Sequence, residues 1–121
     1  MSIQRIEAGP RMSEAVVHGG KVYLCGVVAC DAAGKSVREQ TADILAQIDA
    51  MLAVAGSDKT KLLKTNIWLT DITTIGEMNA VWDAWVVPGK TPARATVEAK
   101  LALPQWAVEI MVEAAMVEAA V

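Results

Sequence analysis

Residues 36–56, SVREQTADILAQIDAMLAVAG, decide the fold, because this stretch carries the start, the buried face and the end of one helix. Ser36 and Glu39 stand at capping-box spacing, so they can satisfy free N–H groups of the first turn. Gly56 can adopt the left-handed conformation that commonly ends a helix. Between these ends, apolar residues recur at helical spacing, namely Val37, Ile44, Leu45, Ile48, Met51, Leu52 and Ala55. A helix with a single apolar face has to cover another element, which we expect to be a sheet.

A second helix is predicted downstream of the first. Thr74 and Glu77 repeat the capping-box spacing. They open an apolar series that ends before Pro88 and consists of Ile75, Met78, Val81, Trp82 and Trp85. At helical spacing, the two tryptophans of this series are expected in the core rather than in a ligand pocket. Residues 62–70, between the two helices, are rich in β-branched and aromatic side chains, which favours a strand.

The remaining strands flank the helices. Upstream, apolar runs predict strands at residues 2–7, 14–17 and 21–28, followed by a loop at 29–35. The sequence His18-Gly19-Gly20-Lys21 joins two of them as a tight hairpin, because Gly-Gly takes the positive φ angles of a primed turn. Downstream, residues 93–101 and 106–116 alternate as strands. The order β-β-β-α-β-α-β-β predicts one α+β domain over residues 1–121, a mixed sheet with two helices on one face.

The composition limits the classes of function. Of the 121 residues, 54% are apolar, yet no window approaches the roughly 20 apolar residues of a membrane span. The apolar surplus is therefore assigned to a subunit interface, and no membrane partner is expected. The net charge is −3 and the 11 Lys and Arg residues are scattered, so we expect no nucleic-acid partner. The N-terminal MSIQRIEAG lacks the apolar core of a signal peptide, and we expect a cytoplasmic protein with reduced cysteines.

No metal and no cofactor are expected from the sequence. The one histidine, His18, lies at the predicted hairpin turn, and with Cys25 and Cys30 it does not offer the spacing of a zinc site. His18 and Cys25 share no local motif that would suggest a catalytic triad. No glycine-rich loop precedes a helix in the way a phosphate-binding loop does.

Two charged residues on the last two strands are candidates for chemistry. Alternation over residues 93–101 groups Ala95, Val97, Ala99 and Leu101 on one face, which we expect to be the helix-facing one. By the same alternation, Arg94 and Glu109 are both expected on the face away from the helices. A guanidinium can bind a carboxylate through two parallel hydrogen bonds, and a neighbouring glutamate can take a proton from water. The residues alone leave open the ordinary alternative that both are solvated strand residues or a structural ion pair.

Several segments together resemble the RidA/YjgF family. The most specific is TPARATVE at residues 91–98, followed by Leu103-Pro104 and by Val108-Glu109-Ile110. Further matches cover most of the chain: YLCG at 23–26, Gln40-Thr41 with the helix that ends at Ala55-Gly56, LKTNIWLTD at 63–71 and MNAVW at 78–82. The short loop at 29–35 and the stretch Trp82-Asp83-Ala84-Trp85 are similar to the YoaB-type branch of that family.

The resemblance implies a chorismate-mutase-like fold and a homotrimer with ligand clefts between adjacent subunits. It also implies cofactor-free hydrolysis of reactive 2-imino or enamino acids to 2-keto acids and ammonia. Arg94 falls on the carboxylate-binding arginine and Glu109 on the water-activating glutamate, while other cleft positions fall on Met12, Cys25, Gly26, Asn79 and Thr96. Because an imine carbon is already electrophilic, the protein needs only to hold the carboxylate and to deliver water.

The chain departs from the family pattern at four positions. Cys25 stands where the family has a serine, Val27 where a glutamine is usual, Met12 near an aromatic position, and Thr96 where many relatives have a small thiol. These changes make the expected cleft less polar. The carboxylate-binding arginine and the water-activating glutamate are both retained, so an enzyme is the leading hypothesis. The alternatives are a trimer that binds or senses a small keto acid without turnover, and an interaction protein whose clefts are remnants.

Overall fold

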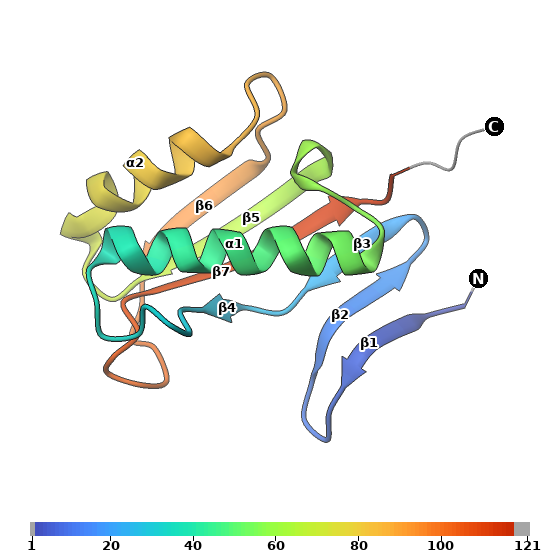
Figure 1. The fold of residues 1–121 in the computed structure, drawn as a ribbon, viewed down its shortest axis with the longest axis horizontal. Coiled ribbons are helices and arrows are strands. Elements are labelled where there is room, and N and C mark those ends of the chain that lie inside the picture. Colours follow the sequence, from blue (N-terminus) through green and yellow to red (C-terminus); the bar gives the residue numbers. More distant parts are fainter. Residues whose placement is uncertain (1, 118–121) are drawn as a thin grey trace.

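A computed structural model describes residues 2–117, and it contains one sheet with two helices packed on one of its faces (Figure 1). The strands occur in the sheet order β1-β2-β3-β7-β5-β6, with β4 paired to β7. β5 and β6 are parallel, and the remaining neighbours are antiparallel. This confirms the predicted α+β mixed sheet. The elements are β1 (Gln4–Ala8), β2 (Ser13–His18), β3 (Lys21–Leu24), β4 (Val27–Val28), α1 (Val37–Ala55), β5 (Leu62–Leu69), α2 (Ile75–Trp85), β6 (Ala93–Glu98) and β7 (Val108–Ala115), with 3-10 turns η1 (Lys59–Lys61) and η2 (Ile72–Thr74).

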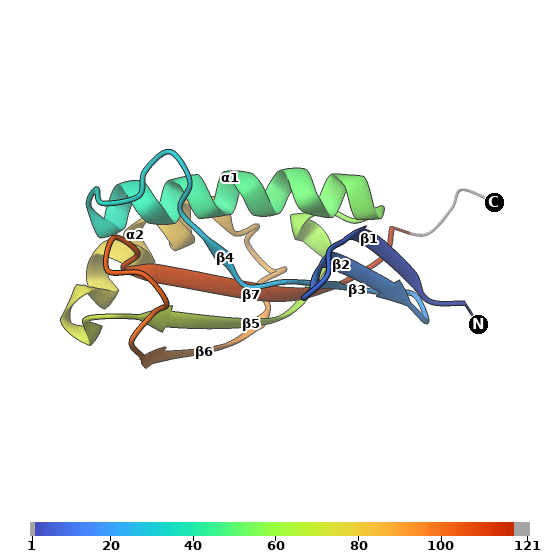
Figure 2. The same ribbon diagram turned by 90° about the horizontal axis from the view of Figure 1, so that it is seen from below.

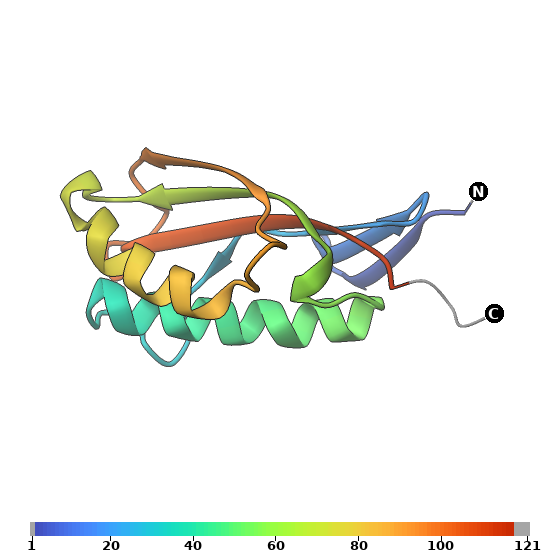
Figure 3. The same cartoon turned by 90° about the horizontal axis from the view of Figure 1, so that it is seen from above.

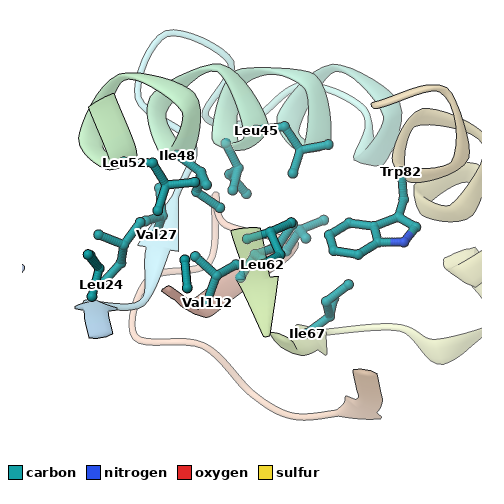
Figure 4. Packing of buried hydrophobic residues seen from close by; sticks show 14 of the residues in the cluster. Leu24, Val27, Leu45, Ile48, Leu52, Leu62, Ile67, Trp82 and Val112 are labelled. Atoms are coloured by element: carbon teal, nitrogen blue, oxygen red, sulfur yellow. The ribbon is translucent and has the colours of Figure 1, made fainter. Parts of the chain in front are cut away.

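Helix α1 begins and ends where its sequence predicts. The Ser36 hydroxyl accepts a hydrogen bond from the Glu39 N–H at 3.1 Å, and Gly56 takes a φ of 87° in the left-handed region. The apolar face between these ends packs on the sheet: Leu45, Ile48 and Leu52 point toward the strand residues in Figure 4. Within the described part of the chain, no helix is both long and apolar enough to cross a membrane.

The start of α2 differs from the prediction. Thr74 makes no side-chain capping bond. The cap lies further upstream, where the Asp71 carboxylate accepts a hydrogen bond from the Thr73 N–H at 3.0 Å and begins η2. Because this 3-10 turn runs directly into α2, Thr74 already sits inside a turn, and its hydroxyl bonds back to the Asp71 carbonyl at 2.6 Å.

The predicted continuous strand at residues 21–28 is interrupted by a bulge. Tyr23 lies opposite Glu113, but Val27 lies opposite Ile110, so β3 and β4 together hold one residue more than the facing part of β7. The extra residue lets Leu24 and Val27, which are three positions apart, both face the helices as buried side chains. The distortion falls at Cys25 and Gly26.

The predicted orientation of β6 is wrong. Arg94 lies opposite Thr65 and Thr96 lies opposite Ile67, and both of these β5 residues are fully buried under the helices. Residues opposite one another in a sheet share a face, so Arg94 and Thr96 face the helices. Val97 faces the other way and is 50% exposed. The prediction took the apolar side of β6 for the core side, but β6 is an edge strand whose apolar side lies on the face without helices.

The face of the sheet opposite the helices is bare (Figures 2 and 3). Trp68 of β5 lies there between Val97 of β6 and Glu109 of β7. Met111, 37% exposed, follows on the same face. An apolar patch of this kind on a bare face is typical of a protein interface.

Gln40, at the first turns of α1, holds the loop that leads into β7. Its side chain is 1% exposed. Its amide nitrogen donates to the Lys35 carbonyl at 2.9 Å and to the Gln105 carbonyl at 3.1 Å. Its amide oxygen accepts from the Ala107 N–H at 2.9 Å. One buried amide therefore ties α1 to the segment that ends two residues before Glu109.

We predict that Gln40→Ala lowers the free energy of unfolding by about 2–4 kcal/mol, because it leaves three part-buried backbone groups in two loops without partners and opens space at a buried position. Denaturant unfolding at matched protein concentration measures the change. Gln105→Ala is the matched control, because its exposed side chain contributes nothing to the network, and it should stay within about 0.5 kcal/mol of the parent. Equal stability of Gln40→Ala and the parent would contradict the role of this amide.

Candidate functional site

The Arg94 side chain is held against α2. Its Nη1 donates to the Asn79 Oδ1 at 2.9 Å, and its Cζ lies 5.5 Å from the centre of the Trp82 ring. Asn79 and Trp82 are three residues apart and therefore lie on the same face of the helix. The guanidinium makes this one side-chain hydrogen bond within residues 2–117, and Arg94 is exposed. An exposed, oriented guanidinium with free donors is suited to bind a carboxylate.

Trp82 is itself fixed by its neighbours. The residue is 5% exposed, and the centre of its ring lies 5.5 Å from the centre of the Trp85 ring. The Trp85 Nε1 donates to Asp49 of α1 at 3.0 Å, and the Lys59 ammonium lies 5.5 Å from the centre of the Trp85 ring. Trp82 thus belongs to the core as predicted, but one face of its ring also supports Arg94 by a cation–π contact.

The sheet beneath Arg94 carries two buried hydroxyls that lack partners. Thr96 follows two residues after Arg94 on the same face of β6, and Thr65 lies directly opposite Arg94 on β5. Neither Oγ1 has a hydrogen-bond partner. Arg94, Asn79, Trp82, Thr65 and Thr96 form one cluster at the β6 edge, which we call the arginine half-site.

Glu109 lies on the bare face of the sheet, close to the bulge. A side chain at Gly26 would overlap the Glu109 carboxylate, because a Cβ there would lie 3.1 Å from the Glu109 Cδ and closer still to Oε2. The absence of a side chain at residue 26 therefore lets the half-buried carboxylate lie against the backbone of the bulge.

Cys25 precedes Gly26 in the bulge and lies opposite Glu14. Its N–H donates to the Glu14 carbonyl at 2.9 Å, continuing the β2–β3 pairing. Burial raises the pKa of the Cys25 thiol, and the negative charges of Glu14 and, less strongly, Glu109 act in the same direction. The thiol therefore stays protonated at neutral pH, where it can donate a hydrogen bond but is a poor nucleophile. Cys25, Gly26, Glu14 and Glu109 form the glutamate half-site.

A hollow of about 170 Å³ lies beside this bulge and is lined by Glu14, Cys25, Gly26, Val27, Val28, Cys30, Gln47 and Met51. A larger hollow of about 350 Å³ between the β1–β2 hairpin and α1 shares Glu14 and Met51 with it. Neither Arg94 nor Glu109 lines the larger hollow, so we do not assign the candidate ligand site to it.

The structure separates the two principal candidates. Glu109 lies opposite Trp68 of β5, whereas Arg94 lies opposite Thr65 of the same strand. Thr65 and Trp68 are three residues apart. Odd spacing along a strand reverses the face, so Arg94 and Glu109 lie on opposite faces of the sheet. Arg94 and Glu109 therefore cannot form an ion pair with each other within one chain.

The other predicted site residues divide between the two half-sites. Asn79 and Thr96 lie with Arg94, while Cys25 and Gly26 lie with Glu109. Met12 is 54% exposed at the β1–β2 turn and joins neither group.

Sequence reasoning missed three neighbours of the site: Glu14, Thr65 and Trp82. Glu14 could have been found by counting back from the Gly19-Gly20 turn, because a two-residue hairpin pairs residue 14 with residue 25. Trp82 could have been found from its spacing to Asn79 on one helix face. No sequence signal identifies Thr65, because its position depends on the pairing of β5 with β6.

Comparison with known proteins gives consistent matches over nearly the whole chain. A profile of the family described as Endoribonuclease L-PSP matches residues 2–116. RutC family protein YoaB of Escherichia coli is 44% identical over 116 residues, covering 96% of this chain and 100% of that protein. A RutC family protein of Haemophilus influenzae is 42% identical over 112 residues, covering 93% and 97%. The crystal structure of a YjgF family member from Neisseria meningitidis has 50% identity and a TM-score of 0.94, and 98% of each chain is covered.

We predict that Glu14→Gln speeds alkylation of Cys25 by iodoacetamide at neutral pH by about two- to fivefold. Removing a negative charge lowers the thiol pKa and so increases the thiolate fraction. The site-resolved rate from mass spectrometry, followed against pH, measures the shift, and Cys30 in the same molecules is the internal control. An unchanged rate at Cys25 would show that the Glu14 charge does not reach the thiol.

Proposed function

Since the chain belongs to the YjgF/RutC family, we propose that it hydrolyses 2-imino and enamino acids to 2-keto acids and ammonia. No cofactor takes part: an enamino acid first tautomerises to the imine, water adds to the C=N bond, and the resulting tetrahedral carbon expels ammonia as the C=O bond forms. The observation that carries the proposal is the presence of two half-sites with complementary chemistry. One offers an oriented guanidinium for a carboxylate, and the other offers a carboxylate for water.

In this proposal Arg94 binds the substrate carboxylate. Asn79 and Trp82 hold the guanidinium from two sides, so part of its conformational freedom is already lost before the ligand arrives. The free donors can then form a bidentate, charge-assisted pair. This contact orients the imine carbon and leaves the chemistry to the other half-site.

Glu109 takes a proton from the attacking water and returns it to the departing nitrogen. Its carboxylate lies against the bulge at Gly26, which limits its motion. The protonated Cys25 thiol beside it can donate a hydrogen bond to a bound water or to the substrate. A positioned general base of this kind contributes about 10²–10⁴-fold to a rate.

The complete site is proposed to form between two copies of the chain in a homotrimer. Arg94 and Glu109 lie on opposite faces of one sheet, so a ligand cannot touch both within a single chain. The bare face next to Glu109 carries Trp68, Val97 and Met111 and is suited to receive a neighbouring subunit. A cyclic arrangement would bring the arginine half-site of one copy to the glutamate half-site of the next.

A second candidate function is binding or sensing of a small keto acid without turnover. The arginine half-site favours it, because its carboxylate-binding groups lie in one chain and need no Glu109. An RNA substrate is less well supported, although the matching profile is described as an endoribonuclease. The net charge of −3 and scattered cations provide no surface for a polyphosphate backbone.

We predict that substitutions of Arg94 impair both ligand binding and hydrolysis, whereas substitution of Glu109 impairs hydrolysis alone. Arg94→Ala should lose both keto-acid binding and hydrolysis, since removing such a charged partner costs about 2–5 kcal/mol. Arg94→Lys should recover little, because an ammonium lacks the planar fork. Glu109→Gln should keep keto-acid binding but lose about 10²–10⁴-fold in hydrolysis.

Calorimetric titration with a 2-keto acid measures binding, and trapping of an imine formed in situ by an amino-acid oxidase measures hydrolysis. If Arg94→Ala binds and hydrolyses like the parent, the carboxylate assignment is wrong. If the parent binds the keto acid but does not accelerate imine loss, the sensing function replaces the enzymatic one.

We predict that mixing Arg94→Ala with Glu109→Gln restores hydrolysis when subunits exchange. In a mixed trimer some interfaces pair an intact Arg94 with an intact Glu109, and random assembly at equal amounts gives about a quarter of the sites. Co-refolding the two inactive variants, followed by the imine assay, measures the recovery. Each variant refolded alone is the control, and no recovery from demonstrably mixed trimers would contradict a site shared by Arg94 of one copy and Glu109 of the next.

A further inference from the structure

Thr65 carries a polar group that the fold leaves without a partner. The residue is fully buried, and its Oγ1 has no hydrogen-bond partner. Buried hydroxyls are nearly always bonded, and an unbonded one destabilises the folded state. Thr41 in α1 illustrates the usual arrangement: it is equally buried, and its hydroxyl donates to the Val37 carbonyl at 2.7 Å.

Thr65, with its unpartnered hydroxyl, lies within the arginine half-site. Its strand partner is Arg94, so the two side chains leave neighbouring strands side by side on the same face. The guanidinium itself extends toward α2, where Asn79 and Trp82 contact it.

We propose that Thr65 is a positioning residue for Arg94, an inference that rests on the proposed carboxylate-binding function. When a ligand carboxylate engages the guanidinium, the Thr65 hydroxyl accepts a hydrogen bond from it and fixes its orientation. The hydroxyl is unsatisfied in the free protein and satisfied in the complex, so its desolvation cost is offset only when ligand is bound. Within residues 2–117, Thr96 has the other buried hydroxyl without a partner, but the family resemblance already assigns it to the cleft.

This role predicts opposite effects on stability and on binding. Thr65→Val removes the unsatisfied hydroxyl at nearly constant volume and should raise Tm by about 3 °C or more. The same variant loses the hydrogen bond to a charged group, so Kd for a 2-keto acid and KM for the imine should each rise about tenfold. The kcat should change by less than about twofold, because Glu109 and water are untouched.

Two further variants separate the hydroxyl from its packing. Thr65→Ser keeps the hydroxyl and loses a methyl group, so it should lower Tm but bind the keto acid nearly as the parent does. Thr41→Val makes the same chemical change at a buried threonine whose hydroxyl donates within α1, and should leave Kd and KM at parent values. The parent protein, tested beside them, reports on the proposed function itself.

The inference is overturned if Thr65→Val binds the keto acid like the parent, or if Thr65→Ser is weakened as much as Thr65→Val. A lower Tm for Thr65→Val would also overturn it, because the hydroxyl would then have a partner in the free protein. If the parent itself neither binds nor hydrolyses, the proposed function fails, and with it the premise of the inference. Raised Tm, tenfold weaker binding and rescue by serine together would support it.

Discussion

Burial of one sheet face under α1 and α2 is the constraint on which the rest of the structure depends. Val108, Ile110 and Val112 of β7 are at most 1% exposed beneath the helices, so Glu109 between them has to face the other way. Arg94 is tied by register to the buried Thr65 and has to face the helices. The two charges most suited to chemistry are thus separated by the sheet itself, and a site that uses both requires a second chain.

The two half-sites meet different physical demands. In the proposed function Arg94 binds a charge while exposed, and α2 limits its motion through an amide and an aromatic ring rather than through a competing carboxylate. A carboxylate partner would have to be displaced by the substrate, whereas an amide contact is more easily given up. In the same proposal Glu109 acts as a base, and it lies beside a glycine and a thiol that stays protonated. Neither neighbour neutralises it.

Two departures from the local rules lie close to these charges. The bulge interrupts a strand at Cys25 and Gly26, beside Glu109. Two buried hydroxyls without partners lie beside Arg94. The capped ends of α1 and the fully bonded amide of Gln40 follow the local rules. Glu7, with a φ of 50°, and the register shift between Leu62 and Lys64 depart from them in β1 and β5.

The sequence by itself determined the element order, the limits of α1 and the candidate residues Arg94 and Glu109, because caps, helical spacing and a family motif are local signals. It did not determine the bulge, the capping of α2 or the face of β6. Alternation states only that neighbours on a strand point in opposite directions; which direction is inward depends on the strand's place in the sheet. That place is set by the pairing of β6 with β5, a contact between distant segments. Tertiary structure alone therefore decided that Arg94 and Glu109 lie on opposite faces.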